Sequence, residues 1–333
     1  MLKRRVVPFL LAAAVLAAAP AAVAPPAAAQ SIQERLEAVV RVRAFVPPDA
    51  RTADSLGRER HGSGVVIDQG GLVLTIGYLI VEADGAEVTL STGRTVPAQV
   101  IGYDHESGFG LLRTLEPPRV RPARFGRSAE LKERDPVLVA AFGGAEGAQP
   151  GFVVSRRAFA GNWEYLIDDA IYTAPPHPHW SGAALFDGEG RLMGIGSLII
   201  GDVSGQRIGI PGNMFVPIDR LPPILADLIA DGAPQGPRKP WMGLATDEVR
   251  GRLFVTRVTP EGPAARAGLA PGDMIASVGG QTPGDLADFY RKVWALGDAG
   301  TEIPLTVLRG AQLREVTIKS IDRHTHLKLK RTY

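Results

Sequence analysis

Ten short apolar segments follow one another between residues 62 and 218, and no long helical pattern interrupts them. Each is rich in aliphatic or β-branched residues, and Gly, Pro, Asp or Asn separates it from the next at near-regular intervals. Short strands joined by turns, without crossover helices, are typical of antiparallel barrels and sandwiches. The pattern therefore predicts a mainly β fold, and the stretch 30–222, about 190 residues long, is enough for two barrels.

A change of period indicates a second domain. Apolar residues recur at helical spacing from Leu221 to Ile229 and Gly232 is a natural stop, so we interpret residues 223–239 as a helix followed by a Pro/Gly linker. Residues 240–320 then mix strand and helix patterns, which predicts an α+β domain. The basic tail at 321–333 is expected to be a solvated terminus, with contact to an anionic surface as the alternative.

The first 29 residues predict a signal peptide, because a basic start is followed by an apolar run and a small-residue end. A membrane anchor is the alternative, but prolines break the run short of the roughly 18 apolar residues that a spanning helix needs. Cleavage after Ala29 would leave 37 − 3 = 34 Lys and Arg against 35 Asp and Glu, a formal net charge of −1. We therefore expect an exported, periplasmic or extracellular protein, and nothing suggests nucleic acid. The chain has no cysteine, so its stability must come from packed cores.

Four stretches of the sequence, in this order, carry a resemblance to a known family: "GSGVVID…GLVLT", "YDHESGFGLL", "WSGAALFDGEGRLMGIG" and "FVPIDRLPPILADLI". Together they resemble the HtrA-type, trypsin-like serine proteases that carry a C-terminal PDZ domain. The resemblance covers residues 60 to 320, nearly all of the predicted mature chain. It implies a trypsin-like double β-barrel followed by a PDZ domain.

In such an enzyme an imidazole takes the serine proton, a buried carboxylate orients the imidazole, and backbone N–H groups bind the oxyanion. The resemblance places Tyr78 at the histidine position, Gly108 at the aspartate position and Ser181 at the serine position. His179 and Trp180 stand where the family has Gly and Asn or Asp in the oxyanion loop. A phenol with a pKa of about 10 is a poor base. The resemblance therefore implies a pseudoprotease, with a serine endopeptidase of residual or rearranged chemistry at Ser181 as the alternative.

A rearranged site would need another base. The candidates are His177 and His179 beside Ser181, His61 before the first strand pair, and the "DHE" stretch at 104–106. We expect these histidines to be ordinary loop or surface residues. His177 and His179 are too close in sequence for both rings to bind one ion, so we predict no metal, and no cofactor is indicated.

The substituted site also has a purely structural interpretation. Ser181 is then a small residue in a tight turn, and Tyr78 fills the space of the missing histidine. Trp180 would plug the rim of the primary specificity pocket. The apolar parts of the Tyr78 and Trp180 side chains would then fill the position of the family's active site.

The second domain carries the binding prediction. The stretch "PWMGLAT" resembles the carboxylate-binding loop of PDZ domains, which implies peptide binding at Trp241, Met242, Gly243 and Leu244. Peptide recognition of this kind adds a strand to a sheet edge, with part of the helix at 285–296 lining the apolar pocket. The expected partners are polypeptides or protein C-termini, and a homo-oligomer or an active HtrA-type protease is a further expected partner. A PDZ fold used only for assembly is the alternative.

Overall fold

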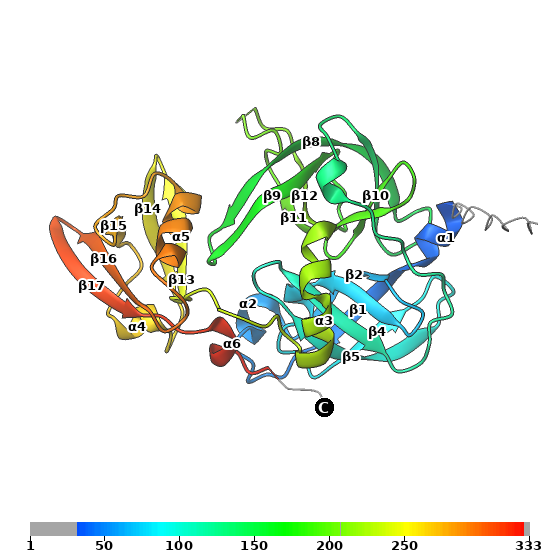
Figure 1. Ribbon diagram of the computed structural model, residues 1–333, viewed down its shortest axis with the longest axis horizontal. Helices are drawn as coiled ribbons and strands as arrows, with labels where there is room; N and C mark the ends of the chain where they lie inside the picture. Colours follow the sequence, from blue (N-terminus) through cyan, green and yellow to red (C-terminus); the bar gives the residue numbers. More distant parts are fainter. Residues whose placement is uncertain (1–31, 207, 330–333) are drawn as a thin grey trace, which may run out of the picture.

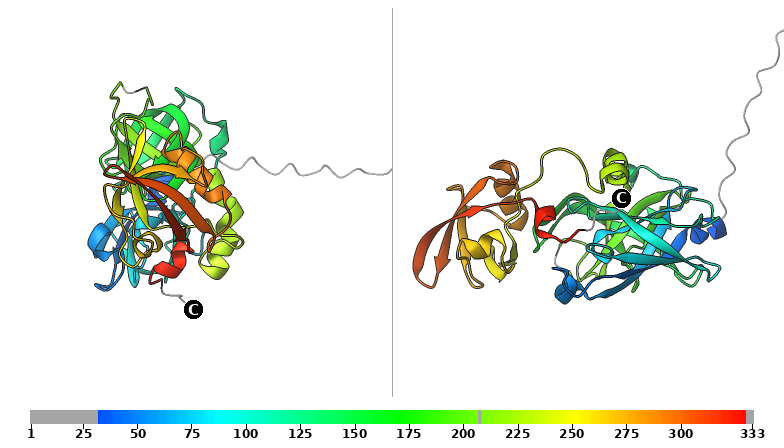
Figure 2. Two further views of the ribbon diagram at one scale, coloured as in Figure 1. Left: turned by 90° about the vertical axis from the view of Figure 1, so that its left-hand side faces the viewer. Right: turned by 90° about the horizontal axis from the view of Figure 1, so that it is seen from below.

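The computed structural model describes residues 32–206 and 208–329, and the predicted signal peptide lies outside them. Two closed six-stranded barrels and a separate five-stranded sheet make up the fold (Figure 1), which confirms the predicted double barrel followed by an α+β PDZ domain. Viewed from two further directions, the third unit extends from one end of the paired barrels (Figure 2). No helix among the described residues is long and apolar enough to cross a membrane.

The first barrel closes in the order β1-β2-β3-β6-β5-β4. Its strands are β1 (Val39–Phe45), β2 (Glu59–Val66), β3 (Leu72–Ile76), β4 (Gly85–Thr89), β5 (Thr95–Tyr103) and β6 (Phe109–Thr114). Three short helical segments accompany them: α1 (Ile32–Glu37), α2 (Ala53–Leu56) and the 3₁₀ turn η1 (Gly77–Leu79). Alternate strand residues such as Val40, Val42 and Val88 are fully buried, so the period-2 pattern forms the core.

The second barrel repeats this order as β10-β11-β12-β9-β8-β7. Its elements are η2 (Ser128–Glu130), β7 (Pro136–Ala140), β8 (Ala148–Gly161), β9 (Tyr165–Ala174), β10 (Ala184–Asp187), β11 (Leu192–Ile200), β12 (Gly212–Pro217) and η3 (Ile218–Arg220). The β8–β9 hairpin is long and reaches beyond the barrel toward the third unit (Figure 1). The tip of that hairpin contacts the third unit.

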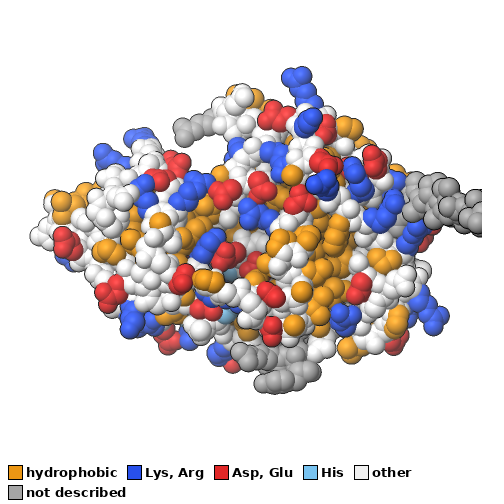
Figure 3. Space-filling model, viewed as in Figure 1, with side chains coloured by type: hydrophobic (Ala, Val, Ile, Leu, Met, Phe, Trp, Pro, Cys, Tyr) orange, Lys and Arg blue, Asp and Glu red, His pale blue; other side chains and the backbone are white. Residues whose placement is uncertain are grey.

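Helix α3 (Pro222–Asp231) follows the barrels and packs across β5. The amide of Tyr103 donates to the carbonyl of Gly232, 3.0 Å away, where the helix ends in a left-handed residue. Figure 3 shows hydrophobic side chains gathered over this helix. Ile224 and Leu225 are half-buried against the barrel core, while Ile229 is exposed.

The third unit is a sheet in the order β13-β14-β15-β16-β17, with β13 at one edge. Its strands are β13 (Leu244–Val249), β14 (Arg252–Val258), β15 (Met274–Val278), β16 (Glu302–Arg309) and β17 (Gln312–Lys319). Its helices are α4 (Pro263–Arg266) and α5 (Leu286–Ala295), and α6 (Arg323–His326) follows the sheet. Phe289, Tyr290 and Val293 of α5 are buried in its core, and Leu166 of β9 joins the same cluster.

Helix α1 ends at Glu37, because the β-branched residues after it form β1. Two local predictions need correction. Strands β1 and β8 were not among the ten predicted segments. The tail was expected to be solvated, but residues 321–329 pack on the molecule: Ile321 pairs with Trp241, and the amide of Lys328 donates to Glu82 at 2.7 Å.

Candidate functional site

Ser181 lies in the loop between β9 and β10, where the two barrels meet. Its carbonyl accepts a 2.8 Å hydrogen bond from the amide of Ser63 in β2, which ties this loop to the first barrel. The residue faces a cleft of about 470 Å³. The cleft is also lined by Arg41, His61, Phe142, His179 and Trp180. The retained hydroxyl therefore has an open space in front of it.

Tyr78, in the η1 turn after β3, points at this hydroxyl. Its phenol oxygen lies 2.9 Å from Ser181 Oγ and 2.9 Å from the carbonyl oxygen of Ser197. A phenol holds one proton, so when it donates to the carbonyl, the Ser181 hydroxyl can donate to the phenol oxygen. The sequence placed Tyr78 and Ser181 at two positions of one site, and the structure brings these two side chains together.

The electrostatics of this pair disfavour proton transfer. Burial raises the pKa of Tyr78 to about 12, and hydrogen bonds from the Ser181 and Trp180 side chains lower it by less. At pH 7 the phenolate fraction is then on the order of 10⁻⁵. A neutral phenol cannot act as the general base that an acyl-transfer reaction requires.

Gly108 has no room for a carboxylate. Its φ is +80°, and a Cβ atom built there would lie 2.6 Å from the hydroxyl oxygen of Tyr165. That hydroxyl donates to the Ser107 carbonyl at 2.9 Å, which holds the ring in place. The carboxylate of Asp104 is used inside its own turn, where it accepts the amide of Ser107 at 2.7 Å. In the part of the chain that the structure describes, the hydrogen-bond partners of the Tyr78 phenol are a hydroxyl and a carbonyl, and none is a carboxylate.

In the oxyanion loop, the backbone amide of His179 is not available to an oxyanion. The amide of His179 donates to Nδ1 of His177 at 3.0 Å. His177 is itself fixed, because its amide donates to the side-chain oxygen of Asn213 at 2.6 Å and its carbonyl accepts the Asn213 amide group at 3.2 Å. Burial lowers the pKa of His177, which favours the neutral ring that can accept this bond. The donor expected at the oxyanion position is therefore occupied within the loop.

The other proposed bases also have partners elsewhere. His61 is exposed and lies 2.9 Å from Glu59. His105 is half-buried between the Tyr103 hydroxyl, 2.9 Å away, and the Glu164 carbonyl, 3.1 Å away. Among the described residues, no three His, Cys, Asp or Glu side chains are grouped as metal ligands would be.

The predicted carboxylate loop does hold a carboxylate. The amides of Met242, Gly243 and Leu244 donate to the side chain of Glu164 at 2.8, 2.6 and 2.9 Å. Gly243 has a φ of +81°, a conformation that L side chains rarely adopt. Glu164 lies at the tip of the β8–β9 hairpin, and the sequence offered no signal for it beyond one acidic residue in a turn.

Trp241 has a different position from the one expected of a peptide contact. Its backbone exchanges hydrogen bonds with Ile321, at 2.9 and 3.1 Å, and its ring packs on His326 with 4.8 Å between the ring centroids. The side chain therefore fixes the tail beside the loop.

Comparison with known proteins agrees with this architecture. Residues 62–195 match the trypsin-like peptidase domain, and residues 240–320 match the PDZ domain. The HtrA-type protease AlgW, solved with a decapeptide, superposes with a TM-score of 0.52 at 24% identity, over 91% of this chain and 100% of that chain. The serine endoprotease from Yersinia pestis gives 0.50 at 23% identity, over 88% and 98%. These findings define a trypsin-like double barrel joined to a PDZ domain.

Sequence relatives identify the family. The chloroplastic Protease Do-like 1 of Arabidopsis thaliana is 30% identical over 312 residues, which cover 86% of this chain and 70% of that protein. The probable periplasmic serine protease do/HhoA-like of Haemophilus influenzae is 29% identical over 274 residues, 78% of this chain and 57% of that protein. The chain belongs to the HtrA family of Do-like serine protease homologues. It spans 57% of the length of that Haemophilus relative and 58% of a DegP-like relative from Halomonas elongata.

Proposed function

We propose that this protein is an exported HtrA-like pseudoprotease whose PDZ domain binds polypeptides or protein C-termini, in envelope protein quality control or its regulation. The observation that carries the first part is the contact between Tyr78 and Ser181, 2.9 Å long, in which a phenol takes the place of an imidazole. Burial raises the pKa of Tyr78 to about 12, so Tyr78 does not act as a base toward Ser181 at neutral pH.

Two further features support the loss of catalysis. Gly108 cannot accept an aspartate side chain without displacing Tyr165, and the His179 amide is bonded to His177. Loss of the serine or histidine of a triad costs about 10⁶-fold in turnover, and an intact oxyanion site alone retains roughly 10³- to 10⁴-fold over water. Here that residual contribution should be smaller, because the His179 amide, one of its donors, is occupied.

The binding role is supported by the loop amides. Met242, Gly243 and Leu244 direct three N–H groups at one carboxylate, the arrangement that a peptide C-terminus requires. The chain could bring such a partner to an active HtrA-type protease or to other copies of itself. A pull-down with immobilised peptides that end in either a free carboxylate or an amide tests this role, and only the free acids should retain the protein.

The second candidate is a serine endopeptidase with rearranged chemistry. The retained Ser181 facing a cleft of about 470 Å³ favours it, and the relatives are named as serine proteases. Labelling with a fluorophosphonate discriminates between the candidates, because the reagent reports an activated hydroxyl independently of any substrate. The pseudoprotease should remain unlabelled.

A further inference from the structure

The carboxylate of Glu164 occupies the ligand position of the PDZ loop. Oε1 accepts the amides of Gly243 and Leu244, and Oε2 accepts the amide of Met242. The residue is only 3% exposed, so solvent does not share these donors. A peptide C-terminus would need the same three N–H groups. The two carboxylates cannot be bound at the same time.

The backbone of the same hairpin also lies along the sheet edge. The amide of Thr246 in β13 donates to the carbonyl of Asn162 at 2.9 Å, and the Asn162 side chain donates to Asp247 at 2.8 Å. Strand β13 is the edge of its sheet, with β14 as its single strand neighbour in the order of that sheet. A bound peptide would pair with this edge, so the hairpin tip takes the place of the peptide backbone as well.

Helix α5 closes the other side. The Tyr290 hydroxyl donates to the Gly161 carbonyl at 2.8 Å and accepts the amide of Glu164 at 3.2 Å. Leu166 is buried in the PDZ core cluster, with Ala158 and Ala160 packed against it. Figure 1 shows the β8–β9 tip next to α5 and β13. The hairpin therefore fills the groove with the three kinds of contact that a peptide would make: carboxylate, backbone and apolar side chain.

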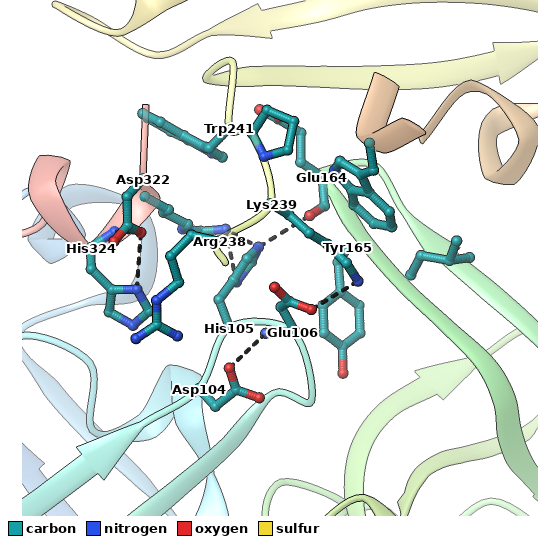
Figure 4. A pocket seen from close by; sticks show the side chains of 14 residues that line it. Asp104, His105, Glu106, Glu164, Tyr165, Arg238, Lys239, Trp241, Asp322 and His324 are labelled. Atoms are coloured by element: carbon teal, nitrogen blue, oxygen red, sulfur yellow. Dashed lines mark hydrogen bonds and ion pairs between the residues drawn. The ribbon is translucent and has the colours of Figure 1, made fainter. Parts of the chain in front are cut away.

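The junction is also held from the barrel side. The carbonyl of Glu164 lies 3.1 Å from Nε2 of His105, and Arg323 of α6 contacts the same ring. Figure 4 shows His105 and Glu164 among the side chains around a small cavity that Trp241 and Lys239 also line. Glu164 has a φ of +60°, a backbone conformation that is uncommon for a non-glycine residue. The contacts on both sides of the residue hold it in this conformation.

We propose that the β8–β9 hairpin tip, Gly161 to Glu164, is an internal ligand of the PDZ groove, and that a partner C-terminus binds only by displacing it. The inference rests on the proposed C-terminal binding function. Because the hairpin is part of the same chain, it competes at a high effective concentration and weakens the apparent affinity of the partner. Displacement removes the contacts between the PDZ domain and the second barrel, so partner binding is coupled to release of the two domains from each other.

The test measures binding of a fluorescein-labelled decapeptide that ends in valine with a free carboxylate, by fluorescence anisotropy, to the full chain. Glu164→Ala should bind about 10- to 100-fold more tightly than the wild type, because it removes the side chain that accepts three hydrogen bonds from the loop amides. Glu189→Ala removes an exposed carboxylate of the same barrel and should bind as the wild type does. Hydrogen exchange of the wild type with the peptide should show lower protection at residues 161–166.

The outcomes separate the two proposals. Equal affinity of the wild type and Glu164→Ala, or unchanged protection of residues 161–166 in the peptide complex, would overturn the internal ligand and leave C-terminal binding intact. Failure of both proteins to prefer the free acid over the same peptide ending in an amide would overturn both. The hydrogen-exchange arm needs no variant, so a folding defect of Glu164→Ala does not prevent a decision.

Discussion

The phenol oxygen of Tyr78 is within hydrogen-bond distance, 2.9 Å, of the Ser181 hydroxyl oxygen, where an acyl-transfer enzyme needs an imidazole nitrogen. The same phenol reaches the Ser197 carbonyl, so it bridges two segments of the second barrel from a turn of the first. The pair therefore contributes to the packing of the two barrels against each other.

Removal of this bridge should destabilise the protein without changing peptide binding. Tyr78→Phe leaves the Ser197 carbonyl and the Ser181 hydroxyl without their phenol partner, which costs about 1–3 kcal/mol of unfolding free energy. Urea denaturation measures this loss, and Ser181→Ala is the control that leaves the bond to Ser197 in place. An unchanged free energy of unfolding for Tyr78→Phe would show that water replaces the phenol at no cost.

The pH dependence of serine reactivity follows from the pKa of Tyr78. Because that pKa is raised to about 12, the phenolate fraction stays at or below roughly 10⁻³ up to pH 9. Fluorophosphonate labelling of Ser181 should therefore be negligible throughout pH 6–9. A labelling rate that rises with a midpoint near pH 7 would instead indicate a histidine base, and His177 and His179 would be the candidates for that base.

Restoration of the two replaced side chains should not restore activity. Gly108→Asp forces a side chain onto a residue with positive φ and against Tyr165, which costs about 2–4 kcal/mol in total. Combined with Tyr78→His it should still give little casein cleavage, because the His179 amide remains bonded to His177. Urea denaturation checks the stability, and Tyr165→Phe should relieve part of the loss. Substantial cleavage by the double variant would show that the oxyanion site is intact.

Peptide affinity should rise with pH if Glu164 competes for the loop. Burial raises the pKa of Glu164 to about 7, against the opposing effect of the three amides and Arg323. The docked hairpin therefore binds more protons than the released one, so docking is strongest below about pH 4.5 and weakens as the pH rises to about 7. The neighbouring Tyr290 hydroxyl has a pKa raised by burial, which favours its protonated form, and burial together with Arg323 holds the pKa of His105 well below its ordinary value, which favours its neutral ring in the docked state.

Binding of the free-acid peptide measured at pH 5 and pH 8 tests this. The wild type should bind several-fold more tightly at pH 8, and Glu164→Ala should show no such difference. The same pH dependence in both proteins would assign it to another group.

The sequence allowed the strand-rich fold and the proximity of Tyr78 to Ser181 to be predicted, because both depend on patterns within short stretches. Short apolar runs such as those of β3 and β6, separated by turn residues, predict the barrel, and the motif around Ser181 indicates one position of the site. Glu164 could not be predicted as a partner of Gly243, since the two residues lie 79 positions apart and no local pattern links them. The bond from His179 to His177 was missed for another reason: it depends on Asn213, 36 residues beyond His177, which holds the backbone amide and carbonyl of His177.

Degradation of unfolded casein by the wild type and by Ser181→Ala, under the same conditions, decides whether the protein is a pseudoprotease. Both proteins should degrade casein no faster than buffer alone, because the phenol that contacts Ser181 is neutral and the His179 amide is bonded to His177. Casein degradation by the wild type that Ser181→Ala abolishes would show instead that the protein is a serine endopeptidase.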